Sequence, residues 1–278
     1  MFDAVSFPGG GNRCYWQGGF WEAAAQSLDL APARVVGVSG GAFAAAYSLL
    51  GLGPRVRELV LEGCKRGLPN FDWRGIARGV PFPVAEMYRE LLDEVLSPAA
   101  FEAINAKADL VVSIARPPRG WPGAFAALVG LASYQLEKKL LGPVHPQWGT
   151  KLGFAPAHVS VRELPDARAW ADVTFASAYV PPIIRLQSIG GHPAMDGGFS
   201  DNVPVEPLRT IEEAGGRTLV LLTRRYRTTP TVTHRQYVEP SETIGVGQFD
   251  ITSPEGIVRA YELGLRDGER FARSMRRA

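Results

Sequence analysis

Short apolar runs and helical spacings alternate along the first fifty residues. Residues 2–7 and 34–38 are nearly continuous apolar runs, each with the length of a buried strand. Residues 15–28 and 42–50 follow them with helical composition and spacing, and Pro and Gly separate the segments. Strand, helix, strand and helix in this order predict a parallel sheet with helices on both faces.

Similar patterns continue to the end of the chain. We expect further helices at residues 54–65, 84–96, 97–106, 121–141, 170–179, 207–214 and 254–276. We expect strands at residues 109–114, 158–163 and 218–223, and a hairpin of residues 185–189 and 192–195. Residues 218–223 are very apolar, so they are predicted as the sheet centre. The fold class is therefore α/β, a three-layer sandwich with a mostly parallel central sheet, in a single domain of residues 1–278.

Composition narrows the class of protein. The chain has 278 residues, of which 46% are hydrophobic, enough for a sizeable core. A net charge of +2 without a basic stripe argues against a nucleic-acid partner. Cys14 and Cys64 predict free thiols in a reducing compartment. There is no signal-peptide pattern, and the longest uncharged stretch, 17 residues between Arg119 and Glu137, is too short to span a bilayer. We therefore expect a cytoplasmic protein.

The sequence Gly37-Val38-Ser39-Gly40-Gly41 is a G-x-S-x-G motif between a predicted strand and a predicted helix. A nucleophile elbow requires that context. Gly37 and Gly41 would allow a tight turn where a Cβ would clash, and Ser39 would lie at a helix N-terminus that favours developing negative charge. The other interpretation is a glycine-rich turn with a capping serine.

A second glycine-rich stretch, Gly9-Gly10-Gly11-Asn12-Arg13-Cys14, follows the first strand. Its free N–H groups could form an oxyanion hole beside Ser39, a phosphate cradle for a dinucleotide, or a plain turn. The dinucleotide fingerprint needs a small residue where Cys14 stands and an acid where the second strand ends at Ser39. Those two positions disfavour dinucleotide binding.

A serine nucleophile needs a base. Asp196, followed by Gly197 and Gly198, could project a carboxylate into a cleft from the end of a hairpin strand, although such a sequence is often a turn. His234 would complete the Ser–acid–His order of an α/β-hydrolase esterase. That fold places several strands before its elbow, whereas one strand precedes the Ser39 strand here, so His234 is predicted to be a surface histidine.

The three stretches together resemble the patatin-like phospholipase family, in order as well as content. Residues 9–13 match its G-G-G-x-R loop, residues 37–41 its G-x-S-x-G motif and residues 196–198 its D-G-G motif. Two shorter stretches add to the match: Asn202-Val203-Pro204, and Ala176-Ser177-Ala178 before Pro181-Pro182. The resemblance covers roughly residues 2–223, and residues 54–155 carry no signature of the family.

The resemblance implies a serine lipid acyl hydrolase with a Ser–Asp dyad and no histidine. Ser39 would be the nucleophile that forms an acyl-enzyme, and Asp196 the general base. The loop amides of Gly9, Gly10 and Gly11, with Gly40, would bind the oxyanion and substrate, and Arg13 would orient the loop or meet a phosphate. The motif glycines are Gly37, Gly41, Gly197 and Gly198. No cofactor and no metal are expected, and the substrate would be a phospholipid or another acyl ester.

Two other functions remain open at this point. The same dyad would support acyl transfer to an alcohol other than water. Alternatively, the chain keeps the fold as a catalytically impaired protein that binds lipid or a partner. Cys14, which stands where the family usually has glycine, favours the second of these. No pattern indicates a particular oligomeric state.

Residues 121–134 carry apolar bulk without charge, from Trp121, Phe125, Leu128, Val129, Leu131 and Tyr134. Lys138 and Lys139 follow. The segment could be a core helix that covers the sheet. The alternative is a helix that lies on a lipid surface, with the lysines at the head groups, and so gives a transient peripheral membrane contact.

Overall fold

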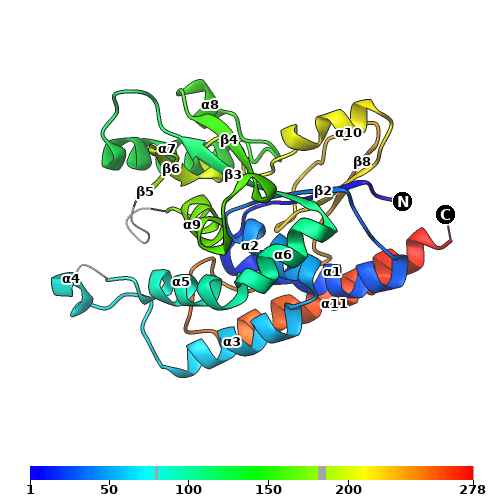
Figure 1. The fold of residues 1–278 in the computed structure, drawn as a ribbon, viewed down its shortest axis with the longest axis horizontal. Coiled ribbons are helices and arrows are strands. Elements are labelled where there is room, and N and C mark those ends of the chain that lie inside the picture. Colours follow the sequence, from blue (N-terminus) through cyan, green and yellow to red (C-terminus); the bar gives the residue numbers. More distant parts are fainter. Residues whose placement is uncertain (79–80, 181–185, 278) are drawn as a thin grey trace.

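The computed structural model describes residues 1–78, 81–180 and 186–277. A mixed sheet with the order β5-β6-β3-β2-β1-β7-β8 lies between layers of helices, and β4 also pairs with β3 (Figure 1). Strands β3, β2, β1, β7 and β8 are parallel, whereas β4 and β6 run antiparallel to β3. The predicted α/β sandwich with a mostly parallel sheet is confirmed.

The strands are β1 (Ala4–Phe7), β2 (Arg34–Val38), β3 (Asp109–Arg116), β4 (Ala155–Ser160), β5 (Gln187–Ile189), β6 (His192–Asp196), β7 (Thr218–Leu221) and β8 (Arg235–Val238). The longer helices are α1 (Tyr15–Leu28), α2 (Gly40–Leu50), α3 (Gly53–Lys65), α5 (Pro83–Val95), α6 (Pro98–Lys107), α7 (Gly123–Leu140), α9 (Ala167–Ser177) and α11 (Pro254–Met275). Shorter helical turns include η1 (Gly11–Cys14), α4 (Gly75–Arg78), α8 (Trp148–Lys151), η3 (Gly197–Phe199), η4 (Glu206–Leu208) and α10 (Arg209–Glu213).

The two faces of the sheet bury different layers. Alternate residues of β1 point to opposite faces, so Val5 and Phe7 join the large core under α1, α2, α9 and α11. Ala4 joins a smaller cluster with Leu208 on the other face. In Figure 1, α7, α8 and α10 lie on that second side of the sheet. Within the described residues, no helix combines the length and the hydropathy that crossing a bilayer requires.

Three parts of the strand prediction need correction. The strand expected at residues 158–163 is β4 at Ala155–Ser160, because Val161–Glu163 form a helical turn. β7 is not central, because it lies between β1 and β8 at one side of the sheet, and β2 occupies the middle. A neighbouring strand on each side and packing on both faces are enough to bury β7 fully. β8 was not predicted at all, because its sequence Arg-Gln-Tyr-Val is half polar and half-buried. The predicted hairpin is present from residue 187 onward, and Arg185 and Pro181-Pro182 lie outside the described residues.

The register of the sheet brings residues that are distant in the sequence together at the carboxyl ends of the parallel strands. Val38 of β2 pairs with Ser113 of β3, and the next residue of β3, Ile114, pairs with Asp196 of β6. Ser39, one residue beyond Val38, therefore lies across β3 from Asp196. The loops after β1 and β7 begin at this same end of the sheet, because both strands run parallel to β2.

Candidate active site

Ser39 forms the sharp turn between β2 and α2. Its backbone has φ 55° and ψ −137°, a conformation that costs a non-glycine residue about 1–3 kcal/mol. The Ser39 N–H donates to Oγ of Ser177 at 2.8 Å, and that hydroxyl donates to the Ser113 carbonyl at 2.6 Å. The predicted elbow is present, and α9 fixes its geometry through Ser177.

The motif glycines of this turn are required by close contacts. A Cβ on Gly37 would lie 2.5 Å from Cα of Ala42, and one on Gly41 would lie 2.2 Å from the Phe7 carbonyl oxygen. A Cβ on Gly40 would lie 3.0 Å from the Gly11 carbonyl oxygen. The start of α2 can therefore pack directly against the loop that follows β1. The N–H of Gly40 lies in the first turn of α2, where the helix itself supplies no acceptor.

Asp196 and Ser39 line the same cavity. Each is only 7% exposed, and both line the cavity together with Gly10 and Asn202. The Ser39 side chain lies close enough to the Asp196 carboxylate to lower its pKa. Oδ1 of Asp196 also accepts the Gly198 N–H at 2.7 Å. A Cβ on Gly197 would lie 2.6 Å from the Ser113 carbonyl oxygen, so the D-G-G sequence lets this turn press against β3.

Burial changes the basicity of Asp196. Loss of water raises the pKa of its carboxyl to about 7, although the hydrogen bonds from Gly198 and Ser39 act in the opposite direction. A carboxylate with an ordinary pKa is a poor proton acceptor for a serine, whereas a pKa near 7 matches the working pH of a general base. A carboxyl with this raised pKa could accept a proton near neutral pH.

The glycine-rich loop contacts three other segments, through Asn202, Thr223 and Gln248. Gly9 is fully engaged: its N–H donates to the Asn202 carbonyl at 3.1 Å, and its carbonyl accepts from Thr223 Oγ1 at 2.7 Å. Gly11 has φ 57°, and a Cβ there would lie 2.2 Å from the Gln248 carbonyl oxygen. The N–H groups of Gly10 and Gly11 have no hydrogen-bond partner among the described residues. Both glycines line the cavity of Ser39.

Arg13 and Cys14 follow this loop on η1. Arg13 is half-buried, and its Nε lies 3.5 Å from the Val246 carbonyl oxygen. Cys14 has an ordinary helical φ of −68°, so the position where the family usually has glycine holds cysteine without strain. The thiol is 3% exposed and faces the Pro8 carbonyl at 3.7 Å. Burial raises the pKa of Cys14 above its usual range, which favours the protonated thiol.

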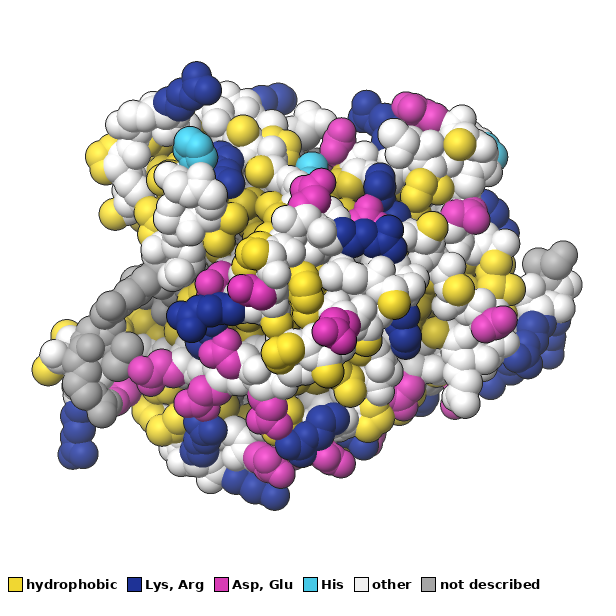
Figure 2. Space-filling model, viewed as in Figure 1, with side chains coloured by type: hydrophobic (Ala, Val, Ile, Leu, Met, Phe, Trp, Pro, Cys, Tyr) yellow, Lys and Arg dark blue, Asp and Glu magenta, His cyan; other side chains and the backbone are white. Residues whose placement is uncertain are grey.

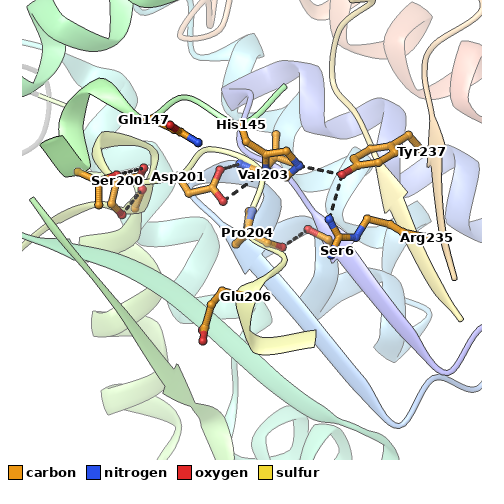
Figure 3. Close-up of polar contacts among 12 residues, drawn as sticks. Ser6, His145, Gln147, Ser200, Asp201, Val203, Pro204, Glu206, Arg235 and Tyr237 are labelled. Atoms are coloured by element: carbon orange, nitrogen blue, oxygen red, sulfur yellow. Dashed lines mark hydrogen bonds and ion pairs between the residues drawn. The ribbon is translucent and has the colours of Figure 1, made fainter. Parts of the chain in front are cut away.

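Histidine takes no part in this arrangement. His234 precedes β8. The first residues of β8, β7 and β1 pair with one another, so His234 lies at the amino ends of the parallel strands, whereas Ser39 lies at their carboxyl ends. His145 lies between Asp201 and Tyr237 (Figure 3), with Nδ1 3.5 Å from Oδ2 of Asp201 and Nε2 2.8 Å from the Tyr237 hydroxyl. The described residues that line the two cavities at Ser39 include no histidine. A Ser–His–Asp triad through His234 is therefore excluded.

Two hollows meet at Ser39. The first extends under α2 and α5 and is largely apolar, with Phe43, Tyr47, Val84, Tyr88 and Phe249 among its lining residues. The second contains Asp196 and is closed by α7, which contributes Leu131, Tyr134 and Gln135. Ser39, Gly11 and Phe249 border both hollows. The space around Ser39 is thus apolar on one side and more polar on the other.

Helix α7 is neither a fully buried core helix nor a detached surface helix. Ala126, Ala127 and Gly130 are buried, whereas Phe125 is 51% exposed and Leu128 is 65% exposed. Hydrophobic side chains gather on the molecular surface over α7 (Figure 2). One face of the helix therefore lines the cavity of Asp196, while another presents apolar side chains to solvent.

Four residues of the site were not among the sequence predictions. Ser177 holds the Ser39 N–H, Asn202 and Thr223 hold Gly9, and the Gln248 carbonyl accepts the Asn12 N–H at 2.9 Å. Ser177 and Asn202 stand in the two shorter stretches of the family resemblance, so those stretches carried a signal. Thr223 and Gln248 lie in irregular segments and could not have been identified by pattern.

Comparison with known proteins gives one family match. The family model described as Patatin-like phospholipase matches residues 5–209, which contain all three motif stretches. No curated protein matches the chain. In the part of the chain that the structure describes, no group of three or more His, Cys, Asp or Glu side chains could hold a metal ion.

Proposed function

The chain belongs to the patatin-like phospholipase family, and from this premise we propose that it hydrolyses lipid acyl esters with Ser39 as nucleophile and Asp196 as general base. The observation that carries the proposal is that Ser39, on its strained elbow, and the Asp196 carboxylate are both buried at one cavity, where burial raises the pKa of Asp196 to about 7. A serine on a strained elbow beside such a base meets the geometric requirement for an activated nucleophile.

The residues suggest the following sequence of steps. Oγ of Ser39 attacks the ester carbonyl while its proton moves to Asp196. The N–H groups of Gly10, Gly11 and Gly40 stabilise the tetrahedral oxyanion, and loss of one such donor typically costs about 3–4 kcal/mol. The intermediate collapses, the alcohol leaves with the proton from Asp196, and acyl-Ser39 remains. Asp196 then takes a proton from a water molecule as the water attacks the acyl-enzyme, and it returns this proton to Oγ of Ser39 as the C–O bond to Ser39 breaks and the fatty acid leaves.

The apolar hollow fits the acyl half of the substrate. Phe43 and Tyr88 line it next to Ser39, and a neighbouring hollow that shares Val84 and Tyr88 continues past Met87 and Leu91. A chain lying there would gain about 0.8 kcal/mol for each buried methylene. We therefore place the acyl chain between α2 and α5.

We further propose that the protein acts as a single domain in the cytoplasm and touches membranes transiently through α7. One buried cluster includes residues from Phe2 to Ala272, which supports a single domain. Phe125, Leu128, Leu136 and Leu140 form an exposed apolar stripe beside the exposed Lys139, a pattern typical of interfacial helices. Phe125→Ala with Leu128→Ala should reduce flotation with anionic liposomes. Trp121 is a poorer target, because its ring packs 6.4 Å from that of Phe154 in a buried cluster.

The test of the function is turnover of p-nitrophenyl esters and phospholipids by the parent protein and by Ser39→Ala. We expect hydrolysis by the parent and none by the variant, with matching circular dichroism. Lipid binding without turnover by the parent would instead support the impaired binding protein. Transfer of the acyl group to an added alcohol in preference to water would support an acyltransferase.

A further inference from the structure

The segment between α3 and α5 presents a tryptophan to solvent. Trp73 is 77% exposed, and Ile76, in the short helix α4 that follows it, is 53% exposed. We call residues 68–78 the Trp73 loop. We propose that this loop inserts Trp73 and Ile76 into a lipid bilayer that carries anionic head groups. The inference goes beyond the proposed function, because it adds a membrane contact separate from α7 and does not depend on turnover.

Contacts within the loop hold Trp73 in its exposed position. The Asp72 N–H donates to the Pro81 carbonyl at 2.8 Å and closes the loop. The ring of Phe71 packs edge-on against two other rings, with its centre 4.7 Å from that of Trp73 and 5.2 Å from that of Phe82. The loop therefore has an ordered stem, and its outer end carries large apolar side chains that the protein itself does not cover. Apolar surface presented in this way indicates contact with another surface.

One side of the stem contacts a segment that lines the site. Oδ1 of Asn70 accepts the Ile251 N–H at 2.9 Å, and its Nδ2 donates to Oδ1 of Asp250 at 3.0 Å. Phe249, the residue before Asp250, lines both hollows at Ser39. The Trp73 loop is thus fixed to the wall of the candidate active site.

The other side of the stem leads directly into α5. Val84, two residues after Phe82, lines the apolar hollow in which we place the acyl chain. In Figure 1, α4 projects beyond α5 at the left end of the molecule, and α7 lies toward the same end. A bilayer that touches both the Trp73 loop and α7 would therefore lie against the end of the molecule at which the acyl hollow is found.

The charge of this segment favours anionic lipid. Residues 65–78 contain four basic residues and one acidic residue, a net charge of +3, whereas the whole chain has a net charge of +2. Arg74, directly after Trp73, is exposed. Tryptophan is enriched where hydrocarbon meets head groups, because its ring is apolar and its N–H is polar, and nearby cations attract anionic head groups.

The same charges disfavour a second copy of this chain as the partner. In a symmetric dimer, one patch meets the identical patch of the other subunit, so two basic loops would come together. An anionic bilayer offers both an apolar phase for Trp73 and opposite charge for Arg74. The structure therefore favours a bilayer over self-association.

Flotation with vesicles tests the inference, and the Ser39→Ala protein is used so that turnover does not change the lipid. The vesicles consist of phosphatidylcholine alone or of equal parts of phosphatidylcholine and phosphatidylglycerol. On the mixed vesicles, Trp73→Ala should lower the partition coefficient about tenfold, since a large side chain no longer leaves water. Arg74→Gln should lower it about fivefold there, and it should leave binding to phosphatidylcholine vesicles unchanged.

The matched controls are Val232→Ser and Arg273→Gln, which change an exposed apolar residue and an exposed cation elsewhere. Val232 precedes β8, and Arg273 is in the last turn of α11, which ends far from α4 (Figure 1). Both variants should bind the mixed vesicles as the Ser39→Ala protein does. Equal partition with and without Trp73→Ala would overturn the inference, whether or not the parent protein hydrolyses esters. A dimer in analytical ultracentrifugation that Trp73→Ala dissociates would also overturn it, because the loop would then contact a second copy.

Quenching by phosphatidylcholine with brominated acyl chains, added to the mixed vesicles, tests insertion itself. Tryptophan emission should fall when the Ser39→Ala protein binds these vesicles, and Trp73→Phe should reduce the quenching. Bound protein whose quenching Trp73→Phe does not change would contradict insertion of this loop.

Turnover by the parent protein separates the membrane contact from a role in the site. Trp73→Ala should keep kcat/KM for a soluble butyrate ester and lower turnover of vesicle lipid about tenfold, in line with the weaker partition. Equal losses on both substrates would mean that Trp73 shapes the site, and would contradict the inference. If the parent hydrolyses neither substrate, the proposed function fails, and flotation alone decides the inference.

Discussion

The two sides of Ser39 differ in how they relate to stability. On the side of α2 and α5, Phe43 and Tyr47 are almost completely buried, so the surface offered to an acyl chain is continuous with the core. On the other side, Asp196 is a buried carboxylate with a raised pKa and Lys138 a half-buried cation with a lowered pKa. The first side stabilises the fold, whereas the second holds ionised groups in an environment that opposes their charge.

This contrast shows where the chemistry is concentrated. A site that must move a proton and stabilise charge needs groups that water would otherwise hold at ordinary pKa values. The strained backbone of Ser39, with φ 55°, lies where the two sides meet. The core under the sheet includes Phe7, Trp16 and Trp170. Its packing stabilises the fold and offsets the unfavourable free energies of the strained Ser39 backbone and the buried Asp196 carboxylate.

The largest effect should come from removing the charge of Asp196. Asp196→Asn should lower kcat by about a thousandfold or more, since the base is lost. The same variant should be more stable than the parent above pH 7, because the folded state no longer buries an ionised carboxylate. Stopped or continuous ester assays and thermal unfolding at pH 8 measure the two effects.

The matched control is His234→Ala, whose side chain lies at the far edge of the sheet. It should keep kcat within about twofold of the parent. A folded His234→Ala without activity, or an active Asp196→Asn, would break the contrast between the two sides.

The pH dependence should report the raised pKa of Asp196. Its ionised form is the base, so kcat/KM should rise about tenfold per pH unit below pH 7 and level off above it. Stability should move in the opposite sense. The folded pKa of about 7 exceeds the ordinary value of 3.8, so the folded state loses stability as pH rises through this range. A profile of kcat/KM that stays flat between about pH 5 and pH 9 would contradict the assignment.

On the apolar side, the chain length accepted should depend on the width of the hollow. Ala85 lines it from α5, and Ala85→Phe should lower kcat/KM for long-chain esters about tenfold relative to butyrate esters, since several methylenes lose their buried position. Ala99→Phe, at an exposed position of α6, provides the control. Equal losses for short and long chains would remove the acyl chain from this hollow.

The smallest effect should follow from changing Cys14. Because its backbone is helical and its thiol is protonated, Cys14→Ala should keep kcat within about threefold of the parent. Cys14→Gly should also remain active, but its free energy of unfolding should fall by about 1 kcal/mol, the usual penalty for glycine in a helical segment. A large loss of kcat in Cys14→Ala would mean that the sulfur takes part in the reaction.

Features that depend on residues adjacent in the chain could be predicted from the sequence, whereas contacts between distant segments could not. The elbow at Ser39 was predictable, because the apolar strand, the glycines and the Ala-rich helix are adjacent in the chain. Helix α1 and strand β2 have the predicted bounds for the same reason. The pairing of Ser39 with Asp196 was available through the family resemblance, because the chain pattern alone does not reveal that β6 lies beside β3.

Other features depend on tertiary structure and leave no local pattern. The raised pKa of Asp196 comes from burial, and the lowered pKa of Lys138 comes from burial and from the charges of Arg224 and Arg13, which are distant in the sequence. Strand β8 exists because β7 offers an edge, not because its own residues have strong strand character.

The central claim is that Ser39 is the activated nucleophile of this site. Intact-mass and peptide analysis after treatment with a fluorophosphonate tests it most directly, since the reagent bonds covalently to an activated serine. The account predicts a single adduct on the peptide that contains Ser39, absent from Ser39→Ala and strongly slowed in Asp196→Asn. Ester hydrolysis by a protein that carries no adduct on Ser39, or carries it on another residue, would contradict the account.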